Sequence, residues 1–292
     1  MIWSEVIGPV LASEKMAELK AFLQEERKTK NIFPSGKEVF RAFDLCQYDI
    51  TKVVIIGSDP YATPDTADGI AFSSKGKRPP QLEVIFKEIY RDLNIQYFHN
   101  LTLDEFFPSP DLSLWAKMGF LMLNSSLTVE EGNPGSHIGR GWELVIEAAI
   151  KALDAKKHQI LYLLWGSDAQ KFKDLVKNPK HLVMEAPHPQ EELDNPSLKI
   201  KFTGCRHFSI VRDVIPMIHN SNIYKTVELD SCFDKEKAKK IVMEHYPVEA
   251  EKICKYIDKD LIINVPVNRD TYFSELRMIE TSFSTKTIHN EL

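Results

Sequence analysis

Short apolar runs occur at four places in the first two thirds of the chain, each closed by glycine, proline or polar residues. The first run, Lys52–Gly57, holds four consecutive β-branched residues, which is typical of a buried strand in a parallel sheet. Comparable runs lie at Gly119–Asn124, Gln159–Trp165 and His181–Ala186. Segments with helical spacing separate them. The pattern therefore predicts an α/β fold, a three-layer sandwich with a central four-stranded parallel sheet flanked by helices.

The intervening segments carry apolar residues at three- and four-residue spacing, as amphipathic helices do. Residues 1–50 are interpreted as helical, with Ser13 placed to cap a helix and a break at Pro34. Further helices are predicted at Leu82–Leu93, Asp111–Met118, Gly141–Leu153, Asp168–Val176 and residues 205–220.

The pattern changes near residue 222, where two strongly charged helical stretches begin, at residues 233–246 and 248–261. We therefore predict one domain over residues 1–221 and a C-terminal helical extension over residues 222–292. Helices packed on the core, or a tethered tail, are favoured for this extension over a module that binds a protein partner.

Composition limits the classes of function. The chain has 292 residues and a formal net charge of −5, so any contact with nucleic acid must come from a local basic patch. Its four cysteines form no CxxC pair, which favours reduced thiols in a cytoplasmic protein and argues against a metal site. No apolar run reaches membrane-spanning length, and the first residues lack a signal pattern. We expect a cytoplasmic protein without a membrane partner.

Polar side chains follow all four predicted strands, and the carboxyl ends of parallel strands share one edge of a sheet. These residues are Asp59, Asn124, Ser167 and His188. A single aspartate after a strand is more often a turn former or helix cap, and a single histidine beside proline is usually structural. Four converging groups, with Tyr61 and Phe72 on the long loop Ser58–Gln81, favour a pocket.

Six short motifs in this chain resemble the family-one uracil-DNA glycosylases in order and spacing. They read GSDPY, GIAFS, LMLNSSLTV, SHIGRGWE, LLWGSDAQK and HPQEEL…GCRHFS, and IFPSGKEVFRAFDL resembles a further N-terminal segment of the family. The resemblance covers roughly residues 3–218. It implies a monofunctional DNA glycosylase that releases uracil, leaves an abasic site for base-excision repair, and needs no metal or cofactor.

The resemblance assigns the chemistry to two residues. Asp59 matches the carboxylate that stabilises the sugar cation and orients the attacking water. His188 matches the histidine that donates a hydrogen bond to the pyrimidine O2 as the base leaves as an anion.

Four residues are expected to bind the base. Asn124 would accept from uracil N3–H and donate to O4, a pattern that cytosine does not meet. Phe72 would stack on the flipped base, and Tyr61 would exclude the methyl group of thymine. Ser58 replaces a glutamine of the family motif, and backbone contacts to the base would survive the change.

Three loops at the same edge are expected to contact DNA, with Leu193 as the wedge into the duplex. The residues are Pro79, Pro80, Gln81, Gly166, Ser167, Leu193 and Arg206. Among the lysines and arginines nearby, Lys77 and Arg78 beside the double proline are the best candidates for phosphate contacts.

The chain departs from the family at further positions besides Ser58. Ala62 replaces a histidine near the catalytic water. Gln81 and Gln190 stand where serines that contact phosphate are expected, and Glu191 and Glu192 would repel phosphates. The HPQEEL segment is either a lengthened surface loop with solvated acids or a sign of altered DNA engagement with single strands, distorted duplex or a partner-assisted substrate.

Three functional hypotheses follow. The leading one is excision of uracil from single- or double-stranded DNA. The second keeps the enzyme class but changes the target to a modified pyrimidine in phage DNA. The third is a non-catalytic homologue that binds DNA or a protein partner through the C-terminal extension.

Overall fold

The computed structural model describes residues 1–93, 102–214 and 243. The chain divides into two compact units, one of residues 1–93 and 109–220 and one of residues 94–108 and 221–292. The helices predicted after residue 222 lie outside the described residues, and a domain boundary at residue 221 stays a prediction. In the part of the chain that is described, no helix is both long enough and apolar enough to cross a bilayer.

A four-stranded parallel sheet forms the centre of the first unit. Its strands are β2 (Val53–Gly57), β3 (Phe120–Asn124), β5 (Leu161–Trp165) and β6 (Leu182–Ala186), in the order β3-β2-β5-β6. Every residue of β2, β3 and β5 is buried, as the continuous apolar runs require. The predicted strands are confirmed to within two residues at each end.

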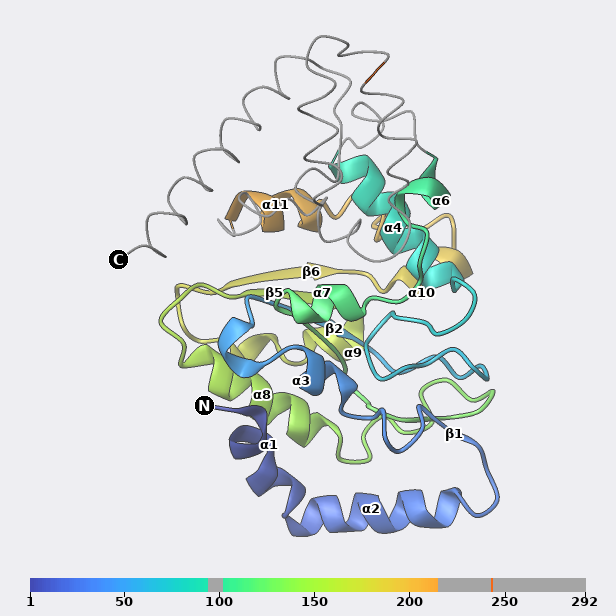
Figure 1. Ribbon diagram of the computed structural model, residues 1–292, viewed down its shortest axis with the longest axis vertical. Helices are drawn as coiled ribbons and strands as arrows, with labels where there is room; N and C mark the ends of the chain where they lie inside the picture. The colour runs from blue at the N-terminus through green and yellow to red at the C-terminus, as the bar shows by residue number, and fades with distance from the viewer. Residues whose placement is uncertain (94–101, 215–242, 244–292) are drawn as a thin grey trace. The chain divides into compact units, whose positions relative to one another are not determined.

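Helices cover both faces of this sheet (Figure 1). On one face lie α4 (Pro80–Asp92) and α11 (His207–Val214), and on the other α1 (Trp3–Leu11) and α8 (Glu143–Asp154). The apolar stripe of α8 is fully buried from Val145 to Leu153, which explains its amphipathic pattern. The three-layer α/β sandwich is therefore confirmed.

The other helices among the described residues follow, together with two 3₁₀ turns. They are α2 (Glu14–Glu26), α3 (Arg41–Leu45), α6 (Leu103–Phe106), α7 (Ser113–Lys117), α9 (Ser167–Gln170), α10 (Pro189–Asp194) and the 3₁₀ turns Tyr48–Ile50 and Lys173–Leu175. The expected cap on α2 is confirmed, because the Ser13 hydroxyl accepts a hydrogen bond from the Met16 amide at 3.4 Å.

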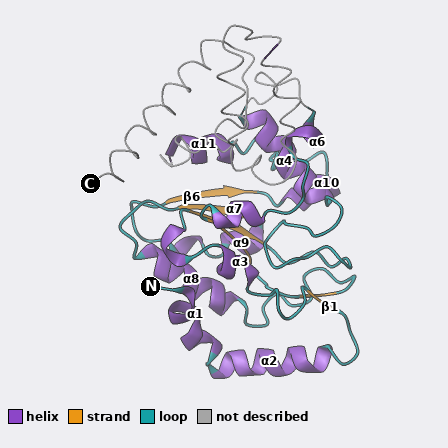
Figure 2. Cartoon of the chain, viewed as in Figure 1, coloured by secondary structure: helices purple, strands orange, loops and turns teal. Residues whose placement is uncertain are grey.

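Three local predictions were wrong. The single helix predicted at Asp168–Val176 is instead the short helix α9 followed by the 3₁₀ turn Lys173–Leu175. The segment 1–50 is not all helical, because β1 (Ile32–Phe33) pairs antiparallel with β4 (Val129–Glu130). The HPQEEL segment is not a loop: it forms α10, which begins with proline and carries Glu191 at its third position, a favourable helix start. Residues 58–79 contain no helix or strand, as expected for a functional loop (Figure 2).

A buried carboxylate, that of Asp68, fixes the middle of that loop. Asp68, 1% exposed, accepts hydrogen bonds from the Ile70 amide at 3.0 Å, the Ser73 hydroxyl at 2.7 Å and Arg41 Nη1 at 2.5 Å. Between these anchors lies Phe72, whose φ of 65° is unfavourable for a residue with a side chain. Asp68 therefore holds the backbone in the conformation that presents Phe72.

Replacing Asp68 with alanine should destabilise the fold by about 3 kcal/mol, because two buried donors and Arg41 lose their acceptor. Urea unfolding followed by circular dichroism measures this. Asp111→Ala is the matched control, since Asp111 lies 3.8 Å from the same arginine but its side chain is 43% exposed. Its change should stay below about 1 kcal/mol. Equal losses in the two variants would show that Asp68 is not the anchor.

Candidate active site

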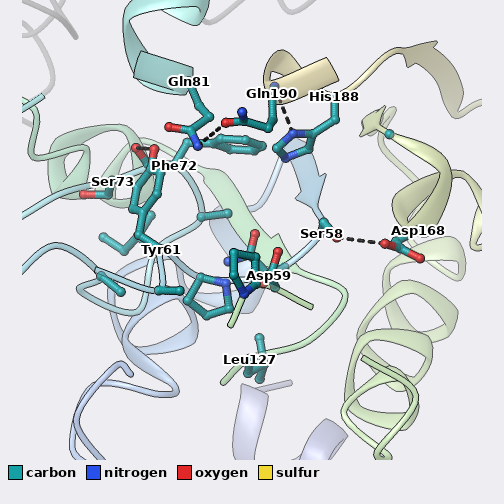
Figure 3. Close-up of a pocket in the computed structure, with 18 of the residues that line it drawn as sticks. Ser58, Asp59, Tyr61, Phe72, Ser73, Gln81, Leu127, Asp168, His188 and Gln190 are labelled. Atoms are coloured by element: carbon teal, nitrogen blue, oxygen red, sulfur yellow. Dashed lines mark hydrogen bonds between the residues drawn. The ribbon is translucent and has the colours of Figure 1, made fainter. Parts of the chain in front are cut away.

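A cavity of about 470 Å³ opens at the carboxyl edge of the sheet. The polar residues predicted at the four strand ends all line it: Asp59, Asn124, Ser167 and His188. Ser58, Tyr61, Phe72, Gln81 and Gly166 line it as well, and Figure 3 shows several of these side chains around one space. The structure thus brings together groups that are more than 120 residues apart in the sequence.

Gly57, the last residue of β2, lies beside two side chains that line this cavity, Phe72 and Asn124. A Cβ at Gly57 would lie 2.7 Å from Phe72 Cζ and 2.8 Å from Asn124 Oδ1, so only glycine fits between them. The Phe72 ring packs against Trp165 at a centroid distance of 5.1 Å. An aromatic face beside an amide suits a flat ring with hydrogen-bonding edges.

His188 lies at the N-cap of α10, 5.5 Å from the Phe72 ring between centroids. Its Nδ1 accepts a hydrogen bond from the Gln190 amide at 3.1 Å, which places the proton of the neutral ring on Nε2. Burial lowers the pKa of His188 to about 4, against the weaker opposing effect of Glu191. The residue is therefore a neutral hydrogen-bond donor at physiological pH.

Gly166 allows His188 to come this close. Its φ is 89°, and a Cβ there would lie 2.8 Å from His188 Cβ. A side chain at this position would push the imidazole away, which explains the glycine directly after β5.

Asp59 is a half-buried carboxylate with a defined orientation. Its Oδ2 accepts a hydrogen bond from the Gly135 amide at 2.6 Å. Burial raises the pKa of Asp59; the Gly135 amide opposes the rise and the negative charge of Asp168 adds to it. A desolvated carboxylate of this kind interacts strongly with a positive charge that develops beside it.

Tyr61 is tied to the same loop as Phe72. Its hydroxyl donates a hydrogen bond to the Phe72 carbonyl at 3.0 Å, and burial raises its pKa. The bond fixes the phenol ring within the cavity wall, where it limits what fits.

Two interactions in the cavity were not predicted. The Ser58 hydroxyl donates to Asp168 Oδ2 at 2.8 Å, and Gln81 Nε2 donates to Gln190 Oε1 at 2.5 Å (Figure 3). Asp168 directly follows Gly166 and Ser167, which were predicted to lie at the site. Its position just after a strand was therefore the one feature of the sequence that could have predicted its place in the cavity.

Four residues predicted to contact DNA do not line the cavity: Pro79, Pro80, Leu193 and Arg206. Pro79 and Pro80 start α4, while the side chain of Arg206 is 76% exposed.

Three of the charged groups expected near DNA have protein partners. Arg78 pairs with Glu83 at 2.9 Å and lies over the Phe86 ring. Glu191 Oε1 accepts from the His188 amide at 3.0 Å, and Glu192 Oε2 accepts from the Thr203 amide at 2.8 Å. The two glutamates are therefore held by the fold rather than simply solvated. Among the described residues, no group of three or more His, Cys, Asp or Glu side chains could hold a metal ion.

Comparisons with known proteins agree on one family. The model of the Uracil DNA glycosylase superfamily matches residues 43–239. The uracil-DNA glycosylase of Rhizobium meliloti is 42% identical over 210 residues, which covers 71% of this chain and 82% of the relative. That of Borreliella burgdorferi (strain ZS7) is 40% identical over 225 residues, covering 76% and 95%.

Solved structures share the fold. The mimivirus uracil-DNA glycosylase superposes with a TM-score of 0.56 at 24% identity, covering 64% of this chain and 67% of that one. A mimivirus UNG variant solved in complex with UGI gives a TM-score of 0.62 at 21% identity, covering 75% and 84%.

The imidazole of His188 should titrate at a pH of about 4, with the proton of the neutral ring on Nε2. Burial disfavours the charged ring, so it gains a proton only well below the ordinary value of 6.5. A series of ¹⁵N-edited NMR spectra measures both the titration and the tautomer, with circular dichroism to verify folding at each pH. Titration near 6.5, or a proton on Nδ1, would contradict this assignment.

Proposed function

Since the chain belongs to the uracil-DNA glycosylase superfamily and is a uracil-DNA glycosylase of base-excision repair, we propose that Asp59 and His188 carry its chemistry. The reaction hydrolyses the N-glycosyl bond between uracil and deoxyribose. One observation supports the assignment above the others: a half-buried carboxylate and a neutral imidazole line the same cavity, together with the Phe72 ring and the Asn124 amide.

The two residues act at opposite ends of the breaking bond. As the C1′–N1 bond breaks, its electron pair moves onto uracil and positive charge develops on the sugar. The Asp59 carboxylate stabilises that charge, while Nε2–H of His188 donates to O2 of the leaving base. A water oxygen then bonds to C1′ and its proton passes to Asp59. A neutral donor suits this task because it stabilises the anion without giving up its own proton.

The side chains that line the cavity select the base. The Asn124 amide accepts from N3–H and donates to O4 of uracil, whereas cytosine would leave it unpaired at a cost of about 1–3 kcal/mol. Phe72 stacks on the ring, and Tyr61, held by its bond to the Phe72 carbonyl, excludes the C5 methyl group of thymine. The backbone at Ser58 contributes to base binding.

DNA lies along the same edge of the sheet in this proposal. Its contacts come from the residues Pro79, Pro80, Gln81, Gly166, Ser167, Leu193 and Arg206. Leu193 is a suitable wedge because it is 38% exposed on α10, and apolar side chains that enter a base stack must be accessible. Both single- and double-stranded DNA are substrates.

The cellular location of the enzyme and its protein partner are also proposals. The curated relatives named above are bacterial proteins, and we place this enzyme in the cytoplasm with cellular DNA. A protein partner that binds residues 222–292 stays a prediction.

Asp59→Asn should slow uracil release about 10²- to 10⁴-fold, because the charge that stabilises the sugar cation is lost while the shape is kept. Alkaline cleavage of abasic sites in single- and double-stranded uracil oligonucleotides measures the rate. Asp65→Asn is the matched control, an exposed aspartate of the same loop with a φ of 55° that asparagine also tolerates. No release by folded wild-type protein, or equal rates in the two variants, would refute the assignment.

Tyr61→Ala should allow the enzyme to excise thymine, because the space for the C5 methyl group opens. Tyr61→Phe keeps the ring and removes only the hydrogen bond to Phe72, so it should still exclude thymine. Oligonucleotides with a single thymine opposite guanine or adenine provide the substrate. If Tyr61→Ala leaves thymine untouched while it still releases uracil, Tyr61 does not select the base.

A further inference from the structure

The hydroxyl proton of Ser58 has a fixed direction. Ser58 Oγ donates to Asp168 Oδ2 at 2.8 Å, and the other oxygen, Oδ1, accepts from Lys171 Nζ at 2.6 Å. Partial burial opposes ionisation of Asp168, yet the bonds from Lys171 and Ser58 lower its pKa overall. An ionised carboxylate only accepts hydrogen bonds, so the donor in this pair is the serine.

The backbone that carries this hydroxyl is also held in place. The Ser58 carbonyl accepts from the Ser125 hydroxyl at 2.6 Å and from the Ser126 amide at 3.0 Å. Both donors belong to the loop after β3, so Ser58 is bonded on one side through its backbone and on the other through its side chain. Little freedom remains for Oγ to turn.

A serine hydroxyl has one proton and two lone pairs. With this proton donated in the hydrogen bond to Asp168, only the lone pairs of Ser58 Oγ remain for other partners, and Ser58 can act toward them solely as an acceptor. Ser58 is the direct neighbour of Asp59, and both line the same cavity (Figure 3). The carboxylate of Asp59 is likewise an acceptor. Two adjacent acceptors match the two hydrogens of one water molecule.

We propose that Asp168 is a positioning residue that acts through Ser58, so that Ser58 and Asp59 together hold the attacking water by its two hydrogens. This rests on the proposed function and deepens it. The water oxygen then keeps a lone pair for C1′. When it bonds to C1′, the C1′–N1 electron pair leaves with uracil and one water proton passes to Asp59. Ser58 keeps its own proton toward Asp168 and takes none.

Without Asp168 the Ser58 hydroxyl could rotate and give its proton to Asp59 or to the water oxygen. Either rotation removes one acceptor and occupies a lone pair that the reaction needs. Asp168 therefore matters only while Ser58 carries a hydroxyl, and this dependence separates the proposal from a general effect of negative charge near the sugar.

A double-mutant cycle tests this dependence. Single-turnover uracil release is measured at saturating DNA for the wild type, Ser58→Ala, Asp168→Asn and the double variant. Each single change should slow release about 10- to 100-fold, the effect of losing one hydrogen bond to a charged group or its orientation. The double variant should be no slower than Ser58→Ala alone to within about twofold.

Two measurements distinguish the proposed role of Asp168 from a general effect of the substitutions on folding or on DNA binding. The Tm of each variant, and the DNA concentration that gives half the maximal rate of Ser58→Ala, should stay at their wild-type values. Lys171→Met is the matched control: it removes the other partner of Asp168, its side chain is 67% exposed, and it should release uracil at the wild-type rate.

Two results would overturn the proposal. One is a double variant whose rate is the product of the two single losses, which means that Asp168 acts independently of Ser58. The other is a Ser58→Ala enzyme as fast as the wild type. In both cases an active, Asp59-dependent wild type would leave the proposed function intact, whereas an inactive wild type would refute the function itself.

Discussion

This active site depends on the burial of two groups, Asp59 and His188, because burial shifts their pKa values in opposite directions. Removing water raises the pKa of Asp59 and lowers that of His188 to about 4. The Gly135 amide opposes the rise at the carboxylate, and the Gln190 amide fixes the tautomer of the neutral imidazole. The result is a charge and a neutral donor in a cavity where both act more strongly than in water.

The sheet register turns this constraint into a site. Gly57 pairs with Asn124, and Trp165 pairs with Ala186. The last residues of neighbouring strands therefore lie side by side, and the loops that follow them meet at one edge of the sheet. Glycines at two of these ends, Gly57 and Gly166, allow Phe72, Asn124 and His188 to approach within contact distance. Asp68 then fixes the loop that presents Phe72. Packing far from the reacting bond thus sets the geometry around it.

Much of this could be predicted from the sequence because the signals were local. Runs such as Lys52–Gly57 specify buried parallel strands, and polar residues after them must share an edge. Interactions between distant segments gave no such signal: Ser58 and Asp168 are 110 residues apart, and Gln81 and Gln190 are 109 apart. The two-residue strands β1 and β4 are too short to show a period, and α10 begins with a histidine cap in place of the usual serine or threonine.

The claim that Asp59 stabilises a positive charge on the sugar is tested most directly by a charged mimic of that sugar. An oligonucleotide carrying a cationic pyrrolidine in place of the deoxyuridine sugar is compared with its neutral tetrahydrofuran isostere, in the presence of free uracil. The wild-type enzyme should bind the cation about 100-fold more tightly, and Asp59→Asn should lose that preference. Equal binding of the two oligonucleotides by the wild type would contradict the account.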